Sequence, residues 1–495
     1  MIDTSNFPDP TYRDTVLAPL FEDAKTHFVA PVRAINQAHL VMLADTGILP
    51  REIGAAIAAA LSDIDANTDI AQQDYTGEHE DYFFFVEHEL IQRLGADVAG
   101  ALHTARSRND MDHTVFKLVL RSKADAFLKA ASALADTLIA TARRERDTVI
   151  VAYTHGQPAQ PSTFGHYLAA VADVLLRDIA RLSAARDALD ACPMGSAAIT
   201  TSGFPIDRQQ VADLLGFAAP TRNSYGAIAG VDYITGLYSA IRLMMLHLGR
   251  VVQDLQFWTA FEVGQLYVPN SLVQISSIMP QKRNPVPIEH LRHLASTTMG
   301  RCETVITTMH NTPFTDMNDS EGAVQVSGYE AFASGHKVLA LVNALIPACR
   351  INGDRVAAIL DAACVTVTEL ADTLVRREDL SFRQAHEIAA ATARAVIAER
   401  APLGSGYAAF AAAFQDATGR STTLGEDAFA TAVSAENFVA IRTRPGGPAP
   451  APMDAALDDM AADLAALGTA QSDRAARIKA AETTLTTAFA ALQES

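Results

Sequence analysis

The sequence predicts an all-α protein whose centre is a bundle of long helices. Apolar residues recur three and four positions apart through Ala30–Ile48 and Glu52–Ile64, and the alternation of Val, Ile and Thr that is typical of strands is nearly absent there. Five later amphipathic stretches exceed the average globular helix of about eleven residues, which favours an extended bundle. These stretches are Thr114–Glu145, Gly165–Leu189, Asp232–Glu262, Pro287–Asn311 and Glu321–Leu345.

Changes in this pattern along the chain predict three domains. Residues 1–110 would form an N-terminal helical domain, residues 111–361 the central bundle and residues 362–495 a small helical C-terminal domain. The last segment contains Ala-rich helical stretches around Pro402–Ala417 and Met453–Leu467, on either side of the loop RPGGPAPAPM. A length of 495 residues, with 49% hydrophobic and 19% charged residues, suffices for several domains with large cores.

Charge and cysteine usage exclude several classes of partner. The formal net charge of −18 leaves no surplus of basic residues for nucleic acid or an anionic membrane surface. The N-terminal segment MIDTSNFPDP lacks the regions of a signal peptide, and apolar runs such as Gly236–Leu248 are interrupted before they reach membrane length. Cys192, Cys302, Cys349 and Cys364 have no metal-binding spacing and are typical of buried thiols. We therefore expect a soluble protein of the reducing cytoplasm.

The acidic run Glu78–Asp81 is the first polar cluster along the chain. Together with His79, Glu87 and His88 it could be read as a metal site. Carboxylates that precede a helix more often stabilise the positive end of the helix dipole. We favour this second interpretation and expect no bound metal.

Ser107, Arg108 and Asn109 stand side by side just before a long helical pattern, within His103–Thr114. A serine at this position would cap the helix. Hydroxyl, guanidinium and amide groups beside a helix N-terminus would also form a receptor for a carboxylate. The two roles are compatible.

Thr154–Ser162, which reads THGQPAQPS, connects the first two bundle helices. His155 can donate to a carboxylate or share a proton, and Thr154 adds a hydroxyl. The alternative is that a lone loop histidine is merely exposed. The later stretch Pro193–Arg208 is rich in small residues but has no phosphate-binding pattern, so we interpret it as a structural connection.

Gln274–Pro285, which reads QISSIMPQKRNP, carries the strongest chemical pattern. Its two prolines prevent a regular helix, which predicts a mobile loop. Ser276 can act as a base if its pKa is lowered, Lys282 can supply a fixed positive charge, and Asn284 an amide donor. A solvated surface loop is the alternative that composition alone supports.

Three of these stretches resemble the motifs of one enzyme family. SSIMPQKRNP resembles the signature loop of the aspartase/fumarase superfamily, although Ile275 stands where that loop usually has glycine. Gln281 and Lys282 resemble its argininosuccinate lyase branch, whereas a hydratase or a nucleotide-substrate lyase would carry a different residue at Gln281. HTARSRND is similar to the family's HTGRSRND, with Ala105 in place of glycine, and THGQPAQP is similar to THLQRAQP.

The resemblance covers nearly the whole chain and implies a three-domain fumarase/aspartase-like fold, assembled as a homotetramer whose active sites are each shared by three subunits. It implies a β-elimination that releases fumarate from an N-substituted aspartate without a metal or organic cofactor. Ser276 would be the base, Lys282 would stabilise the aci-carboxylate, and Glu289 would orient a catalytic His155. The substrate would be held by Ser107, Arg108, Asn109, Thr154, Gln157, Met279 and Asn284.

The positions expected around the leaving amine depart from the argininosuccinate lyase pattern. Phe83 replaces a histidine, Gly226, Gly230 and Val231 replace Asp, Asp and Arg, and a tyrosine is missing from Asn311–Gly322. These departures favour a different amine, and ethylenediamine-disuccinate is the first candidate because lyases for it belong to this branch. Argininosuccinate is the alternative substrate, and a non-catalytic structural homologue is a remote third possibility.

Overall fold

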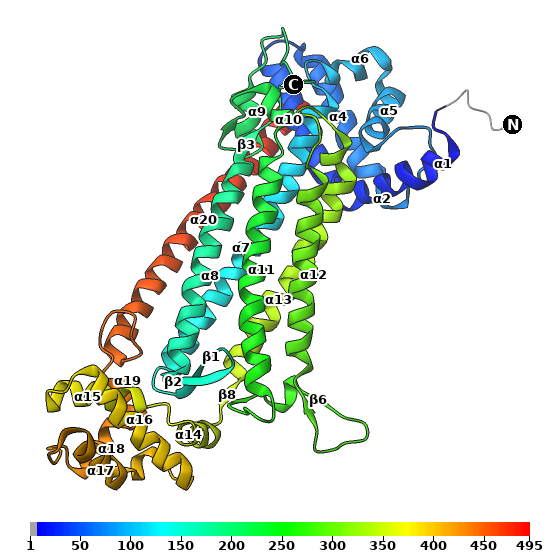
Figure 1. The fold of residues 1–495 in the computed structure, drawn as a ribbon. Coiled ribbons are helices and arrows are strands. Elements are labelled where there is room, and N and C mark those ends of the chain that lie inside the picture. The colour runs from blue at the N-terminus through cyan, green and yellow to red at the C-terminus, as the bar shows by residue number, and fades with distance from the viewer. Residues whose placement is uncertain (1–6) are drawn as a thin grey trace.

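The computed structural model describes residues 7–495. The N-terminal segment in which we expect no signal peptide therefore lies partly, over residues 1–6, outside the described residues. Five long helices run side by side at its centre (Figure 1). They are α7 (Arg108–Arg144), α8 (Phe164–Asp187), α11 (Asp232–Thr259), α12 (Val286–Thr308) and α13 (Gly322–Ala348). The five predicted bundle helices are confirmed, with ends that differ by a few residues.

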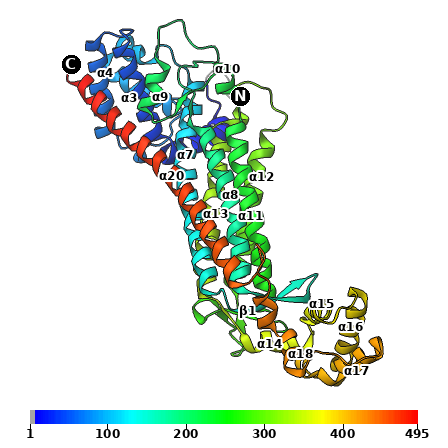
Figure 2. The same cartoon turned by 90° about the vertical axis from the view of Figure 1, so that its left-hand side faces the viewer.

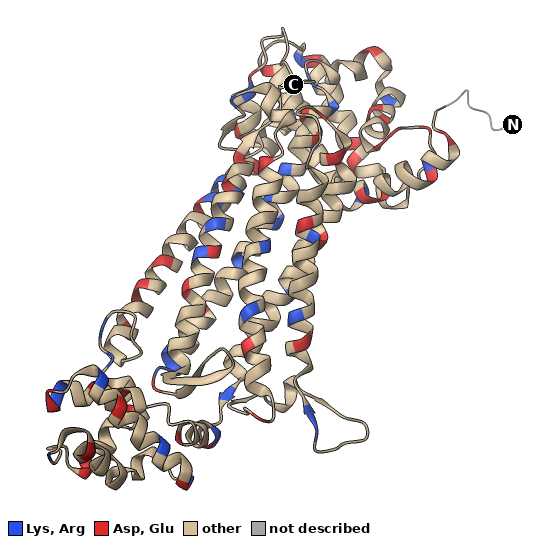
Figure 3. Ribbon diagram, viewed as in Figure 1, with Lys and Arg blue, Asp and Glu red and all other residues tan. Residues whose placement is uncertain are grey.

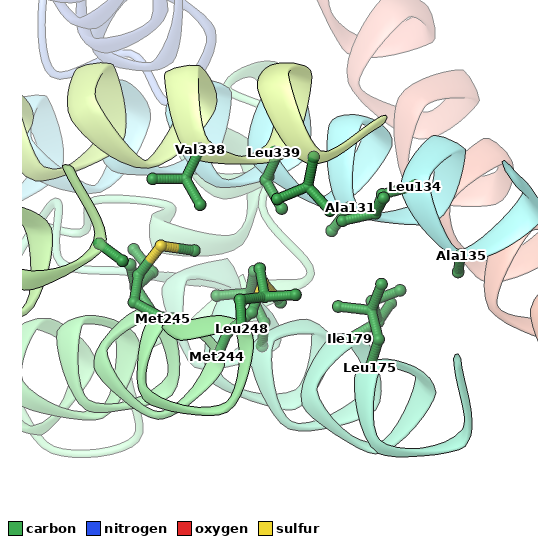
Figure 4. Packing of buried hydrophobic residues seen from close by; sticks show 14 of the residues in the cluster. Ala131, Leu134, Ala135, Leu175, Ile179, Met244, Met245, Leu248, Val338 and Leu339 are labelled. Carbon is green, nitrogen blue, oxygen red and sulfur yellow. The ribbon is translucent and has the colours of Figure 1, made fainter. Parts of the chain in front are cut away.

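One continuous apolar core joins these helices. Leu134 of α7 and Met244 of α11 are fully buried, and Figure 4 shows side chains of α7, α8, α11 and α13 converging on the same interior. Burial of such a side chain stabilises the fold by about 2 kcal/mol. A Cβ at Gly335 of α13 would lie 2.7 Å from a ring carbon of Phe127, so α7 and α13 approach each other more closely there than an alanine would permit.

The N-terminal helices pack at one end of the bundle around a second apolar core, in which Ile35, Leu43 and Ile57 are fully buried (Figure 1). They are α1 (Pro10–Tyr12), a π-helical turn (Arg13–Leu17), α2 (Ala18–His27), α3 (Val29–Asp45), α4 (Arg51–Asn67), α5 (Tyr82–Leu94) and α6 (Ala96–Gly100). Two short helices from the central part of the chain, α9 (Arg208–Leu214) and α10 (Ser224–Ala229), lie at the same end.

A small helical unit with its own core follows the bundle. Phe410, Phe414 and Phe429 are fully buried in that core. The Glu378 carboxylate is also buried and accepts hydrogen bonds from Thr423 N (2.7 Å) and Arg420 Nη1 (2.8 Å), which fixes the connection after α17. The unit comprises α14 (Gly353–Ala362), α15 (Val367–Glu378), α16 (Phe382–Glu399), α17 (Tyr407–Thr418), α18 (Glu426–Ala432) and α19 (Ala435–Ala440).

The last helix, α20 (Pro450–Gln493), returns along the bundle to the N-terminal helices (Figure 2). It packs against α7 and α8 in the bundle and against α3 and α4 beyond it. Ion pairs secure it along the way, including Arg146–Asp454 (2.8 Å) and Arg474–Asp187 (3.1 Å). The proposed domain boundaries at residues 110 and 361 remain predictions, and α20 links all three segments.

Strands are few and short, in agreement with the predicted all-α class. The longest pair is β1 (Val149–Thr154) with β2 (Gln157–Thr163), which is antiparallel. The other pairs are β3 (Ala191–Cys192) with β4 (Ala219–Pro220), β5 (Leu266–Tyr267) with β8 (Arg350–Ile351), and β6 (Gln274–Ile275) with β7 (Arg283–Asn284). Short 3₁₀ turns occupy Ile70–Gln72, Ala101–His103, Ala188–Asp190, Asn270–Leu272, Asn318–Ser320 and Leu403–Ser405.

Burial agrees with two further expectations. The four cysteines are free and buried, as predicted. Within the described part of the chain, only the helical segment Asn318–Ala348 is long and apolar enough to cross a membrane, and half of its apolar window is buried. This segment contains α13, which packs against α7 and α12 as a bundle helix. Acidic and basic residues are interspersed along the helices of the visible face (Figure 3).

Candidate active site

The three polar motifs lie at two opposite ends of the bundle. Ser107–Asn109 stand at the start of α7, beside the N-terminal helices, whereas β1 follows the far end of the same helix (Figure 1). The 37 residues of α7 correspond to a length of roughly 55 Å. The loop between β6 and β7 lies at the same end as β1 and β2. One protomer therefore separates the carboxylate receptor from the other two motifs by the length of the bundle.

The carboxylate receptor is built on the N-terminus of α7. Ser107 is the N-cap: its hydroxyl accepts a hydrogen bond from Asn109 N at 3.4 Å, and its own N–H donates to Asp110 Oδ1 at 2.9 Å. This capping box explains why the helix starts here. The amide of Asn109 donates to Ala198 O at 3.3 Å, so the receptor also rests on the segment after β3.

Asp110 holds this end of the helix to a loop far away in the sequence. Its Oδ2 accepts hydrogen bonds from Gly195 N and Ala197 N, both at 2.9 Å, and the side chain is fully buried. Burial raises the pKa of Asp110 to about 6, although the three backbone donors act in the opposite direction. The carboxylate thus fixes the loop 195–198 against the receptor.

Arg108 is held by two carboxylates that precede α5. Its Nη1 lies 2.8 Å from Glu80 Oε1, and its Nε lies 3.3 Å from Asp81 Oδ2. Burial lowers the pKa of Arg108, but the charge of Asp81 and the other carboxylates more than offsets this and leaves the pKa above its ordinary value. Asp81 is also the N-cap of α5 and accepts a hydrogen bond from Phe84 N at 3.0 Å, so this one carboxylate of the acidic run stabilises a helix N-terminus.

Thr154, His155 and Gln157 occupy the tip of the β1–β2 hairpin. Thr154 pairs with Gln157, so His155 and Gly156 form a two-residue turn. Both have positive φ, 54° and 72°, as the tightest hairpin turns require. All four residues of the tip are exposed. The hairpin therefore presents the histidine away from its own protomer.

The loop between β6 and β7 presents Ser276 with backbone donors directed at its oxygen. Ser276 Oγ accepts hydrogen bonds from Met279 N at 3.1 Å and Ile278 N at 3.4 Å. Arg283 anchors the base of the loop, because its Nη2 donates to Val268 O at 2.6 Å and its guanidinium lies 4.7 Å from the Tyr267 ring centroid. Hydrogen bonds to the oxygen stabilise its charged form, which is the condition for a serine base.

The rest of this loop is exposed. Lys282 is exposed and Asn284 half-buried, and Ile278 and Ile275 leave 84% and 77% of their surface in solvent. Exposed aliphatic residues on a loop this polar are typical of a surface that becomes covered by another molecule or another part of an assembly.

A single protomer does not assemble the predicted site. Among residues 7–495, no hydrogen bond or ion pair links the receptor, the hairpin tip and the signature loop, and none joins Glu289 to His155. Glu289 lies in the first turn of α12 and is exposed. The roles assigned to these residues therefore remain predictions that depend on more than one subunit.

Comparison with known families supplies the identity. Residues 22–300 match the family model described as lyase, and residues 364–440 match the model described as the argininosuccinate lyase C-terminal region. The first match covers more than half of the chain. The chain belongs to the aspartase/fumarase superfamily, in its argininosuccinate lyase-like branch. It is a carbon–nitrogen lyase of the fumarate-forming kind.

Relatives across the superfamily agree with this membership. Argininosuccinate lyase 2 of Agrobacterium fabrum is 62% identical over 452 residues, 91% of this chain and 90% of that protein. Argininosuccinate lyase of Halorhodospira halophila is 34% identical over 84% of this chain and 87% of that protein. Among solved structures, EDDS lyase in complex with formate has a TM-score of 0.84 at 27% identity, over 98% of this chain and 99% of that chain. The fumarase/aspartase-like fold is thereby confirmed.

Two features of the site have no signal in the sequence. The pattern of Pro193–Arg208 indicates only a structural connection, yet Gly195 and Ala197 bind Asp110 beside the receptor. The carboxylates of Asp112 and Glu321, which come from α7 and the start of α13, line a cavity with Arg108. Local patterns reveal neither contact, because the partners are far apart along the chain.

Proposed function

We propose that this lyase releases fumarate from argininosuccinate by β-elimination, leaving arginine. The observation that supports argininosuccinate as the substrate is the 62% identity, over most of both chains, to a protein named argininosuccinate lyase 2. This choice reverses the preference that the departures around the leaving amine suggest. Those departures remain, but the 62% identity to argininosuccinate lyase 2 of Agrobacterium fabrum favours argininosuccinate over them.

The chemistry assigns a proton acceptor to the signature loop. Ser276 Oγ takes the proton from the carbon next to one succinyl carboxylate, the carbon–nitrogen bond breaks, and the electron pair leaves with the nitrogen while a carbon–carbon double bond forms. Backbone N–H groups of Met279 and Ile278 already point at Oγ and favour its ionised form. Lys282 and Asn284 would stabilise the charge that develops on the carboxylate.

Each site would be completed by several subunits of a homotetramer. Ser107, Arg108 and Asn109 of one subunit, the hairpin tip with Thr154, His155 and Gln157 of another, and the loop with Ser276, Met279 and Lys282 of a third would enclose one substrate. The separation of these motifs along α7 supports this arrangement, because a single protomer could not bring the motifs together around one substrate. Glu289 would orient His155 across that interface.

Ethylenediamine-disuccinate is the second candidate substrate. The structure of EDDS lyase matches 98% of this chain with a TM-score of 0.84, and this similarity supports the second candidate. In this chain, however, the identity to that lyase is 27%, less than half of the identity to argininosuccinate lyase 2.

A comparison of kcat/KM tests the substrate. Fumarate formation is followed by its ultraviolet absorbance with argininosuccinate and with ethylenediamine-disuccinate under the same conditions. We expect at least a hundredfold preference for argininosuccinate. A preference for ethylenediamine-disuccinate would reject the proposed substrate and retain the lyase chemistry.

A further inference from the structure

The β1–β2 hairpin, which carries His155 at its tip, is weakly held by its own strand pairing. The register places Pro161 opposite Val151 and Pro158 opposite Tyr153. A proline has no N–H to donate to the strand opposite it, and an isolated two-stranded hairpin is marginally stable at best in water. The hairpin therefore needs support from another part of the chain if its tip is to keep one position.

Gln265 supplies this support from a fully buried side chain. Its Oε1 accepts a hydrogen bond from Val151 N at 3.1 Å, and its Nε2 donates to Val151 O at 3.2 Å. The N–H and C=O of one strand residue point to the same side of the strand, so both groups of Val151 are directed away from Pro161 and towards Gln265. The side-chain amide thus takes the place of a third strand beside β1.

The backbone of Gln265 is itself fixed. Its C=O accepts a hydrogen bond from Asn352 N at 2.9 Å, and the next residue, Leu266, pairs with Ile351 in the β5–β8 ladder. Helix α14, which follows β8, packs against both strands of the hairpin (Figure 1). Gln265 therefore ties the hairpin to a paired strand that lies 114 residues away from Val151 in the sequence.

The same segment holds the base of the signature loop through other groups. Arg283 Nη2 donates to Val268 O at 2.6 Å, and the Arg283 guanidinium lies 4.7 Å from the Tyr267 ring centroid. Neither contact involves the side chain at position 265. A substitution of Gln265 that keeps its volume should therefore release the hairpin and leave the base of the loop in place.

We infer that Gln265 is a positioning residue of the lyase reaction, which acts through His155 by fixing the backbone of Val151. The inference rests on the proposed function, in which His155 contacts the substrate, and adds a residue that lies outside the three motifs. A side chain at this position must carry both a donor and an acceptor to bind both backbone groups of Val151. Leucine has a similar volume and carries neither.

Hydrogen exchange of the full-length protein without substrate tests the anchor. The amide of Val151 exchanges when its bond to Gln265 opens, so residues 149–154 should exchange about tenfold faster or more in Gln265→Leu. Gln325→Leu is the matched control, because Gln325 is also fully buried and its side chain donates to a backbone carbonyl, Ser320 O at 2.9 Å, at the start of α13. It should leave exchange in the hairpin unchanged. Unchanged exchange in Gln265→Leu would overturn the inference.

A double-mutant cycle tests whether Gln265 acts through His155. The value of kcat is measured for Gln265→Leu in the parent and in the His155→Asn background. We expect a loss of about tenfold or more in the parent and of less than about threefold once the histidine is gone. Gln325→Leu should change kcat by the same factor in both backgrounds. An equal loss from Gln265→Leu in both backgrounds would make its role merely structural and reject the inference.

Gln265→Glu provides a rescue that depends on pH. A protonated glutamate offers one donor and one acceptor, as glutamine does, whereas an ionised one places a negative charge against Val151 O. Burial can raise the pKa of a glutamate to about 8–9. The kcat of this variant should therefore approach that of the parent near about pH 6 and fall about tenfold or more below it by about pH 9. A ratio of the two kcat values that stays constant over this range would contradict the inference.

These experiments separate the positioning role from the proposed function. The kinetics use argininosuccinate or ethylenediamine-disuccinate, whichever the parent converts. If the parent converts neither while the hairpin of Gln265→Leu exchanges faster, the proposed function is rejected and only the anchoring of the hairpin is retained. If fumarate forms but the cycle gives equal losses, the reaction stands and the positioning role is rejected.

Discussion

Ser276 carries the central chemical step, so its removal should abolish turnover. Ser276→Ala takes away a proton acceptor that contacts only backbone amides of its own loop. We expect kcat to fall at least a hundredfold, within the range typical of a lost general base, while the fold is retained. The measurement is fumarate release, with circular dichroism as the check on folding.

Ser277→Ala is the matched control for this prediction. Ser277 is the neighbour of Ser276 in the same loop. Its substitution should leave kcat within about twofold of the parent. Similar losses in both variants would indicate that the loop conformation, rather than the Ser276 oxygen, limits the reaction.

Asp110 should make the stability of the receptor depend on pH. Its folded pKa of about 6 lies above the ordinary value of 3.8, so the folded state binds the proton more tightly. This contribution is fully present below about pH 4 and is lost as pH rises through about 6. Two pKa units correspond to up to about 3 kcal/mol. The contribution of Asp110 to the free energy of unfolding therefore falls as the pH rises.

Asp110→Asn isolates that contribution. The free energy of unfolding is measured by urea denaturation for parent and variant at pH 4 and pH 7. We expect the difference, parent minus variant, to decrease by about 1–3 kcal/mol between the two pH values. A constant difference would mean that burial does not raise the pKa of Asp110.

The sequence alone identifies only some of the residues that form the candidate site. Ser107, Arg108 and Asn109 are recognisable because a cap and a helix start are local patterns. The bonds from Gly195 and Ala197 to Asp110 span 85 and 87 residues, and no local pattern reports such a contact. The same reason hides Asp112 and Glu321.

At the scale of elements, the turn at the tip of the β1–β2 hairpin should be needed for activity more than for stability. Gly156 has φ of 72°, and a Cβ there would meet nothing within 4 Å. Gly156→Ala therefore costs about 1 kcal/mol through backbone strain alone. Because the turn also orients Thr154 and His155, we expect kcat/KM to fall about tenfold or more.

Gly419→Ala provides the control with the same backbone cost. Gly419 ends α17 with φ of 73°, and a Cβ at this position would likewise meet nothing within 4 Å. It lies in the small C-terminal unit, away from the three motifs. Its substitution should lower stability by a similar amount and leave kcat/KM unchanged. An equal loss of activity would assign the effect to general destabilisation.

Helices are predicted well where an apolar stripe and a cap agree. The apolar stripe alone places the start of α7 at Thr114, whereas the helix begins at Arg108, directly after the cap that the sequence predicts at Ser107. The exception in length is α20, for which the sequence predicts only Met453–Leu467, since its Ala-rich sequence has no pronounced apolar stripe. The hairpin at Thr154 is expected as a plain loop, because its prolines mask the strand pattern.

For the whole molecule, the decisive feature is the length of the bundle. α7 places Asn109 at one end, and the hairpin and the signature loop lie at the other (Figure 1). The sequence suggests shared sites only through resemblance, because no pattern along one chain shows which copy completes which site. The fold gives this expectation a physical basis, since roughly 55 Å of rigid helix keeps these residues apart within one protomer.

Subunit complementation tests this account most directly. Asn109→Ala and Ser276→Ala proteins, each inactive alone, are unfolded, mixed in equal amounts and refolded together, and fumarate release from argininosuccinate is measured. If the two residues of a site come from different subunits, random assembly leaves both intact in about a quarter of the sites, so activity should return to about a quarter of the parent level. No recovery in oligomers verified to contain both variants would contradict shared sites.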